Sequence, residues 1–187
     1  MYEDVNGDGK LDTNDFVYLG SDDPKIQFSM NAGLEWKGFD VQVVFQGAGK
    51  RTVWRDDANR IPMRATYLNS PDYFVGRIWS KENPDGFYPS LTNQSDINNY
   101  NYQCSSWQVQ DGSYIRLKNV TVGYTFNEKM LKPLRVVNSI RLYFTGTDLW
   151  EHSKINDGWD PEASRKVSGV GRYPFLRNYT VGLNVGF

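Results

Sequence analysis

Strict alternation of apolar and polar residues is the feature that most constrains how this chain can fold. From Ile26 to Trp36, every second residue is apolar and the residues between them are small or polar. A second run of this kind begins at Phe39, directly after Lys37-Gly38. A period of two places successive side chains on opposite faces of a β-strand. Two such runs joined by a Lys-Gly pair predict a β-hairpin.

The same alternation recurs later in the chain, and no stretch of comparable length shows a helical period. The predicted strands cover residues 26–36, 39–47, 114–126, 140–150 and 177–187. In the last of them the apolar side contains no polar residue, since it consists of Tyr179, Val181, Leu183, Val185 and Phe187. The sequence therefore predicts an all-β fold of antiparallel strands.

The length and the ends of these strands favour a membrane over a soluble sheet. Most of the runs reach ten or eleven residues, whereas strands of soluble sheets average about 5–6 and tilted transmembrane strands need about 9–11. Aromatic residues gather near the strand ends, at Trp36, Phe39, Phe126, Trp150, Tyr179 and Phe187. Barrels in outer membranes carry such aromatic girdles at both interfaces. We therefore expect the apolar face to contact lipid and the face rich in Gly, Ser, Thr and Asn to border a hydrated interior.

The connections between the strands alternate in length. Residues 37–38 and 127–138 form short connections, whereas 51–112 and 151–176 are long. Outer-membrane barrels combine short periplasmic turns with long external loops, which predicts that residues 1–25 also lie outside the cell. Too few strands are present to close a barrel, and lipid does not tolerate open strand edges. Further strands must come from elsewhere.

Composition excludes several other classes of function. A net charge of −1 argues against nucleic-acid binding, which needs a clustered basic surface. The single Cys104 has no second thiol for a disulfide or a redox pair, and no apolar stretch approaches the about 18 residues of a membrane helix. No signal peptide follows Met1. An exported chain needs one, so we expect its natural N-terminus to lie upstream.

Residues 4–15 match the spacing of the twelve-residue calcium loop of EF-hands. The predicted ligands are Asp4, Asn6, Asp8, the backbone carbonyl of Lys10, Asp12 and Asp15. Gly9 occupies the sixth position, where the sharp turn needs glycine. The departure is Asp15, which replaces the usual bidentate Glu and has a shorter reach. The spacing predicts a weak structural calcium site, and the alternative is an Asp-Gly-rich turn without metal.

Several other residues are candidates for a binding or catalytic site. The loop tryptophans Trp54, Trp79, Trp107 and Trp159 could stack on a ligand or pack the loops together. His152 is the only histidine, and no nucleophile context accompanies it. The carboxylates of Asp157, Asp160 and Glu162 are close in sequence, but beside Pro161 they indicate a turn rather than an acid–base pair. We therefore expect no catalytic residue, and the chain is not predicted to be an enzyme.

Several stretches together resemble one family, the SusC/RagA-like TonB-dependent outer-membrane transporters. They are residues 4–12 (DVNGDGKLD), 33–40 (GLEWKGFD), 45–47 (FQG), 111–126 (DGSYIRLKNVTVGYTF), 142–149 (LYFTGTDL), 160–162 (DPE), 173–174 (YP) and 177–187 (RNYTVGLNVGF). Their order covers nearly the whole chain, and the resemblance is to the C-terminal part of such a transporter. The terminal Phe187 resembles the outer-membrane assembly signal.

The resemblance implies a large barrel in the bacterial outer membrane with an N-terminal plug. It also implies energy supply through TonB, a SusD-like surface lipoprotein as partner, and import of oligosaccharides or peptides. The plug and the TonB box have no counterpart in this sequence, so both would belong to a missing N-terminal part. The shared motifs are strand and turn features, and no substrate-binding residue can be carried over.

An alternative interpretation remains open from sequence alone. A soluble, secreted, calcium-containing carbohydrate-binding β-sandwich would also have alternating strands and many aromatic residues. Its two stacked layers would bury Phe28, Val122 and Leu183 together, whereas a barrel wall would leave them exposed. A glycoside hydrolase domain is a third option, and it would depend on Asp160 and Glu162.

Overall fold

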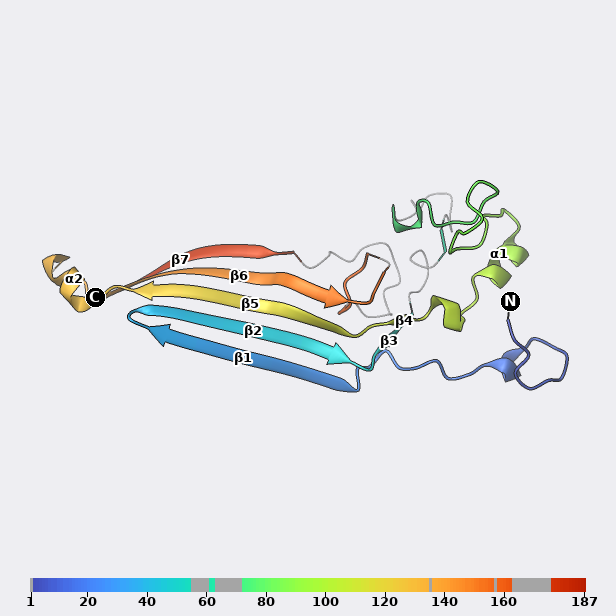
Figure 1. The fold of residues 1–187 in the computed structure, drawn as a ribbon, viewed down its shortest axis with the longest axis horizontal. Helices are drawn as coiled ribbons and strands as arrows, with labels where there is room; N and C mark the ends of the chain where they lie inside the picture. The colour runs from blue at the N-terminus through green and yellow to red at the C-terminus, as the bar shows by residue number, and fades with distance from the viewer. Residues whose placement is uncertain (1, 55–60, 63–71, 135, 157, 163–175) are drawn as a thin grey trace. The chain divides into compact units, whose positions relative to one another are not determined.

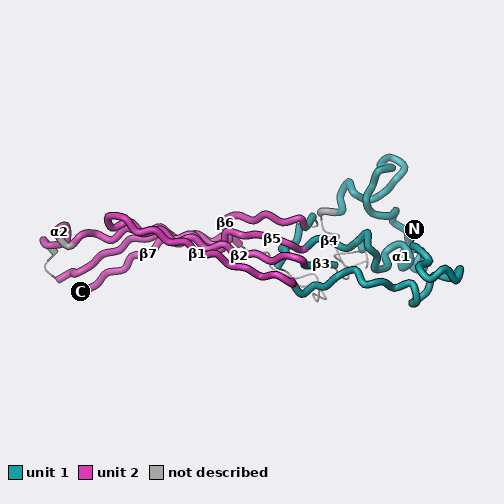
Figure 2. The backbone as a smooth tube through the Cα atoms, turned by 60° about the horizontal axis from the view of Figure 1, so that its bottom comes forward, with its two compact units in different colours: residues 1–23, 51–111, 155–173 teal, residues 24–50, 112–154, 174–187 magenta. Residues whose placement is uncertain are grey.

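The computed structural model describes residues 2–54, 61–62, 72–134, 136–156, 158–162 and 176–187. The chain divides into two compact units, which Figure 2 shows in different colours. Unit 1 comprises residues 1–23, 51–111 and 155–173, and unit 2 comprises residues 24–50, 112–154 and 174–187.

Unit 2 is a five-stranded antiparallel sheet in the order β1-β2-β5-β6-β7 (Figure 1). The strands are β1 (Ile26–Trp36), β2 (Phe39–Gly49), β5 (Tyr114–Thr125), β6 (Ser139–Ser153) and β7 (Asn178–Gly186). Two strands extend beyond the residues that alternation predicts, since β2 continues past residue 47 and β6 past residue 150. The all-β, antiparallel prediction is confirmed.

The pairing register places the apolar residues of all five strands on one face. A single row across the sheet consists of the successive partners Leu34, Val41, Val122, Phe144 and Val181. At the two edges of this row the side chains are almost uncovered, with Leu34 69% and Val181 71% exposed. Each strand therefore turns its apolar side the same way, as the period of two requires.

Nothing covers this apolar face within the described part of unit 2. Within unit 2, no described helix packs extensively against the five strands, so the described part of this unit is a single layer. Phe28, Val122 and Leu183 are 44%, 40% and 61% exposed. Two stacked layers would have buried these three residues, and the β-sandwich alternative is therefore not supported.

The β1–β2 and β5–β6 connections lie at the same end of the sheet, since Phe39 pairs with Tyr124. Lys37 and Gly38 join β1 to β2 with φ angles of 48° and 91°, the positive values that the tight turns of hairpins require. Residues between β5 and β6 include the short helix α2 (Glu128–Leu131) and the 3₁₀ turn η5 (Lys132–Leu134), where the sequence predicts only a short connection. None of the described helices is long and apolar enough to cross a membrane.

Unit 1 contains short elements and a small apolar core of its own. Its elements are η1 (Thr13–Asp15), β3 (Thr52–Val53), η3 (Asp72–Phe74), α1 (Ser95–Asn101), η4 (Ser106–Gln108) and β4 (Gln110–Asp111), with β3 paired to β4. The buried core consists of Ile61, Phe74, Tyr88 and Tyr102, with Ile78 packed against it. The region that the sequence predicts as a long loop, residues 51–112, thus holds a folded cluster.

Candidate functional site

The N-terminal loop is organised by Asp4. Its Oδ1 accepts a hydrogen bond from the Gly7 N–H (2.7 Å), and its Oδ2 accepts one from the Gly9 N–H (2.7 Å). Gly7 and Gly9 have φ angles of 74° and 79°, values that glycine adopts without steric cost. The two glycines let the backbone wrap around one carboxylate, which explains the Asp-x-x-Gly-x-Gly pattern of this segment.

The next polar side chains each hold the backbone two residues further on. Asn6 Oδ1 accepts from the Asp8 N–H (2.9 Å), and Asp8 Oδ1 accepts from the Lys10 N–H (2.8 Å). Asp12 caps η1 by accepting from the Asn14 N–H (2.7 Å). Side chains of Asp and Asn commonly form such local turns.

Asp15 closes the loop by reaching back to its beginning. Its Oδ1 accepts from the Val5 N–H (2.8 Å), and its Oδ2 accepts from the Asp12 N–H (2.9 Å). The Asp12 N–H, followed by those of Val5 and Asn6, lowers the pKa of Asp15 below its ordinary value. Hydrogen bonds to a carboxylate favour its charged form. The residue at the twelfth position of the motif therefore fastens the two ends of the loop together.

The fit of calcium to this loop is mixed. The predicted ligands all offer oxygen, which hard divalent cations prefer, and they lie on one twelve-residue loop. Within the described ranges, however, no group of three or more His, Cys, Asp or Glu side chains is arranged to hold a metal ion. The aspartates instead satisfy backbone N–H groups of the loop itself, so calcium stays a prediction.

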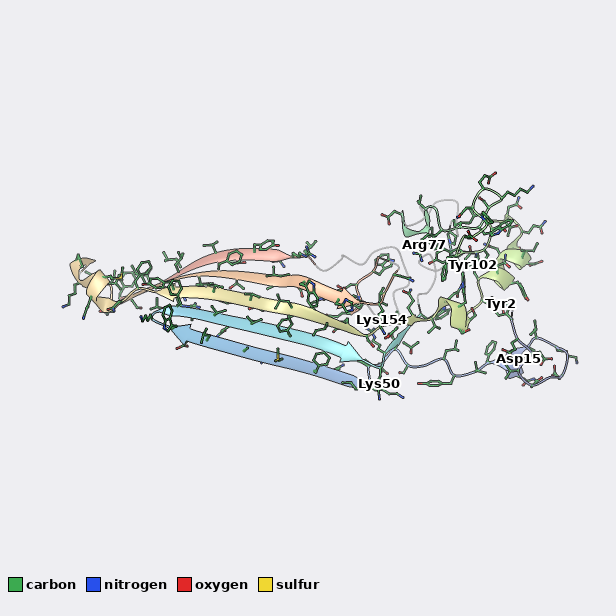
Figure 3. All side chains as sticks on the ribbon, in the orientation of Figure 1. Tyr2, Asp15, Lys50, Arg77, Tyr102 and Lys154 are labelled. Carbon is green, nitrogen blue, oxygen red and sulfur yellow. The ribbon has the colours of Figure 1, made fainter. Side chains whose placement is uncertain are left out.

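Tyr2 attaches the segment before this loop to helix α1 (Figure 3). Its hydroxyl donates to the Tyr100 carbonyl oxygen (2.7 Å). The two tyrosine rings also meet edge to face, with centroids 5.0 Å apart. The loop is thereby connected to the folded cluster of unit 1 by a hydrogen bond and a ring contact that sequence reasoning did not find.

Trp107 is the predicted loop tryptophan with the clearest aromatic partner. Its ring stacks on Phe87 with centroids 4.6 Å apart and an interplanar angle of 23°. The edge of the stack contacts the buried Tyr88, whose ring centroid lies 5.7 Å from that of Trp107. Trp107 and Phe87 are 37% and 43% exposed. The pair is thus seated on the core of unit 1 while much of its surface stays accessible.

The other three tryptophans have different surroundings. Trp54 donates from Nε1 to Gln108 Oε1 (3.3 Å), so its polar edge is used inside unit 1. Trp79 is 44% exposed, and its backbone N–H donates to the Tyr88 carbonyl (2.8 Å). Trp159 is half-buried. Trp107 contributes the stacked ring pair with Phe87.

Two arginines connect separate segments of unit 1, and neither contact follows from the alternation or the motifs of the sequence. The guanidinium of Arg77 lies 5.5 Å from the Phe87 ring centroid, and its Nη1 donates to the Asn156 carbonyl (3.1 Å). The buried Arg51 pairs with Asp22 (2.8 Å) and also donates to the Pro161 carbonyl. Aromatic composition in Gly86-Phe-Tyr-Pro89 was the only feature that could have indicated the first contact.

The remaining candidates that the structure describes have separate surroundings. Asp160 Oδ1 accepts from the Glu162 N–H (2.7 Å), which is the turn that the sequence predicts. Asp157 lies outside the described residues. His152, in unit 2, stacks on Trp150 with ring centroids 6.4 Å apart. Cys104 is an exposed residue of unit 1.

Comparison with known proteins gives no matching family model, but similarity to several curated proteins extends over the whole chain. The chain is 33% identical over 203 residues to TonB-dependent receptor P26 of Formosa agariphila, covering 100% of this chain and 19% of the receptor. It is 21% identical to TonB-dependent receptor SusC of Bacteroides thetaiotaomicron, covering 100% of this chain and 17% of that protein. The chain thus spans about a fifth of the length of these relatives.

Solved structures show the same fold. The RagAB peptide transporter superposes with a TM-score of 0.69 at 20% identity, covering 94% of this chain and 19% of that one. The RagAB peptide importer in the "closed-closed" state gives a TM-score of 0.69 at 22% identity, covering 95% and 20%. The fold prediction, a segment of a large outer-membrane β-barrel with long loops, is confirmed.

Proposed function

Since the chain is SusC/RagA-like along its whole length and its curated relatives are TonB-dependent receptors, we propose that it forms part of the barrel wall of an active importer. The bacterial outer membrane is its location. One observation supports the proposal most directly: five adjoining strands leave a continuous apolar face uncovered. Soluble proteins rarely expose so large an apolar surface, whereas lipid covers it in a barrel.

The polar face of the sheet would border the hydrated interior. Its charged residues are mostly paired within the sheet, as in Arg116–Glu151 and in Lys118–Asp148 (3.0 Å). Strands of membrane barrels alternate apolar outside and polar inside. β1 and β7 each have only one neighbour in the described sheet, so further strands would have to complete the wall.

Transport would require parts that these strands do not supply. We expect energy to enter through TonB and a plug, and a SusD-like lipoprotein to cover the external loops. The cargo would be an oligosaccharide or a peptide, and peptides are what the solved RagAB structures are named for. The substrate would be moved without covalent change, so no residue is assigned a catalytic role.

We also propose that the N-terminal loop binds calcium and that exposed loop aromatics contact the cargo. The spacing of residues 4–15 supports the first idea, because its Asp and Asn side chains and one carbonyl offer oxygen at the positions that calcium loops use. The stacked pair Trp107–Phe87 supports the second, since exposed aromatic faces can stack on sugar rings or apolar side chains. Trp54, Trp79 and Trp159 are further candidates for such contact.

Membrane fractionation tests the proposed wall. The chain, exported to the envelope of a bacterial host, should sediment with the outer membrane and resist extraction with alkaline carbonate. Detergent should then be needed to solubilise it. A chain that stays soluble without detergent and binds oligosaccharide on its own would contradict the proposal and restore the secreted binding domain.

A further inference from the structure

An ion pair on the polar face of unit 2 joins two strands that are not neighbours. Asp40 lies on β2 and Arg141 on β6, with β5 between them. Arg141 nevertheless donates from Nε to Asp40 Oδ1 (3.0 Å) and from Nη2 to Asp40 Oδ2 (2.5 Å). The two parallel bonds form the bidentate geometry that is strong and directional for Arg and carboxylates.

Gly123 on β5 leaves the space through which this pair passes. It is the direct register partner of Asp40. A Cβ atom at Gly123 would lie 2.5 Å from Asp40 Oδ1 and 2.6 Å from Arg141 Nη2. Both distances are far shorter than any ordinary contact, so a side chain here would push the two charged groups out of their present positions. Glycine at this position therefore has a packing reason rather than a conformational one.

The same arrangement continues toward the edge of the sheet. The Arg141 guanidinium lies 5.0 Å from the ring centroid of Tyr143, close enough for a cation–π contact. The Tyr143 ring in turn covers Gly182 on β7, because a Cβ atom there would lie 2.2 Å from its Cζ. Two long side chains thus lie flat over two glycines.

We infer that Asp40, Gly123, Arg141, Tyr143 and Gly182 form one polar strap across β2, β5, β6 and β7. Backbone hydrogen bonds connect only adjacent strands, whereas the strap couples β2 directly to β6. No second layer packs on this face in the described part of unit 2, so side-chain links of this kind carry the coupling that a core would otherwise provide. The strap also keeps both charges paired and close to the sheet surface.

Paired glycine variants of the full chain test the strap. Gly33 on β1 lies on the same face of the same sheet, and the only atom near its hypothetical Cβ is Val41 O at 3.8 Å, an ordinary contact. We expect Gly123→Ala to lower the urea midpoint of unfolding of the chain folded in detergent micelles. Gly33→Ala, the matched control, should leave the midpoint almost unchanged. Equal midpoints for the two variants would overturn the inference.

A side chain at Gly123 could also lower stability for reasons unrelated to the ion pair. A double-mutant cycle on Asp40 and Arg141 tests the ion pair itself. Asp40→Asn and Arg141→Gln should each lower the midpoint, and the double variant should lie no lower than the worse single variant, because one interaction is lost in all three. Hydrogen exchange should accelerate at the turn-proximal amides of β5 and β6 in both single variants and not in Gly33→Ala. Additive shifts in the cycle, or unchanged exchange, would contradict coupling across β5.

Discussion

Asp15 shows how a single carboxylate can fasten a loop without being buried. Its oxygens accept backbone N–H groups from both ends of the N-terminal loop, and the resulting pKa is below the ordinary value of 3.8. A lowered pKa means that the folded loop prefers the charged form. Its stabilising contribution is therefore complete above pH 3.8 and is lost as the pH falls through the lowered pKa.

We predict that acidification below pH 3.8 opens the loop of the wild-type chain. The protection factors of the Val5 and Asp12 amides should then fall, as measured by hydrogen exchange with NMR detection and corrected for the intrinsic exchange rate at each pH. In Asp15→Asn these amides should already have low protection factors at neutral pH, and acidification should change them little. Asp23→Asn, which lies outside the loop, serves as the control. If the loop opens identically in the wild type and in Asp15→Asn, the Asp15 carboxylate does not fasten the loop.

Tyr102 offers a second test at the level of one residue. It is 1% exposed, and burial, with a smaller effect of Tyr88, raises its pKa from 10.0 to about 12. The folded cluster therefore holds the phenol proton more tightly than the unfolded chain, and unit 1 should lose stability as the pH rises from 10.0 toward 12. The difference in tyrosinate absorbance between the wild type and Tyr102→Phe should reveal a tyrosine that ionises well above pH 10.0. Titration of Tyr102 near pH 10.0 would contradict its burial.

At the level of elements, the period of two was sufficient to locate all five strands of unit 2. Every residue on the apolar side of β7 also lies on the apolar face of the sheet, because alternation fixes the face that each residue takes. The sequence could not locate the register shifts at Val44/Phe45 and at Leu117/Asn119. An extra residue such as Lys118 interrupts the pairing with β2 and becomes visible only when the partner strand is known.

The folded cluster of unit 1 was harder to predict for a different reason. Phe74, Tyr88 and Tyr102 form a core although they are far apart in sequence and follow no period. The N-terminal loop could be predicted from residue spacing because its contacts are local and run from Asp4 to Asp15. Contacts such as Arg77 with Asn156 depend on where distant segments meet, and local patterns carry no information about that.

The hairpin between β1 and β2 provides a prediction about backbone geometry. Gly38 has a φ of 91°, and a Cβ there would lie 2.7 Å from Thr125 O. We expect Gly38→Ala to destabilise unit 2 by about 1–3 kcal/mol, the usual range for a strained backbone position. Lys37→Asn should be neutral or slightly stabilising, because Asn tolerates positive φ. Urea unfolding of both variants measures the difference, and equal stabilities would contradict the strained turn.

The calcium hypothesis is tested on the same loop element. If calcium binds residues 4–15, Asp8→Ala should lower the melting temperature of unit 1 in calcium and have a smaller effect in a chelator. Magnesium, which demands stricter octahedral geometry, should not reproduce the calcium effect. Asp23→Ala controls for loss of one negative charge outside the loop. The same melting temperature with calcium and with chelator in the wild type would remove the site.

At the level of the whole molecule, we propose that the apolar face of unit 2 contacts lipid. The tryptophans divide conveniently for a test: Trp36 and Trp150 lie on that face, and Trp54, Trp79, Trp107 and Trp159 belong to unit 1. Trp36 and Trp150 are 64% and 48% exposed, so a quencher in the surroundings of the sheet can reach them.

Fluorescence quenching by brominated acyl chains measures this contact directly. The chain is reconstituted in brominated and in ordinary phosphatidylcholine vesicles, in one variant that retains only Trp36 and Trp150 and one that retains only the other four tryptophans. Strong quenching of the first variant and weak quenching of the second is the expected result. If the variant that retains Trp36 and Trp150 fluoresces equally in brominated and in ordinary lipid, the sheet is not a membrane-spanning wall.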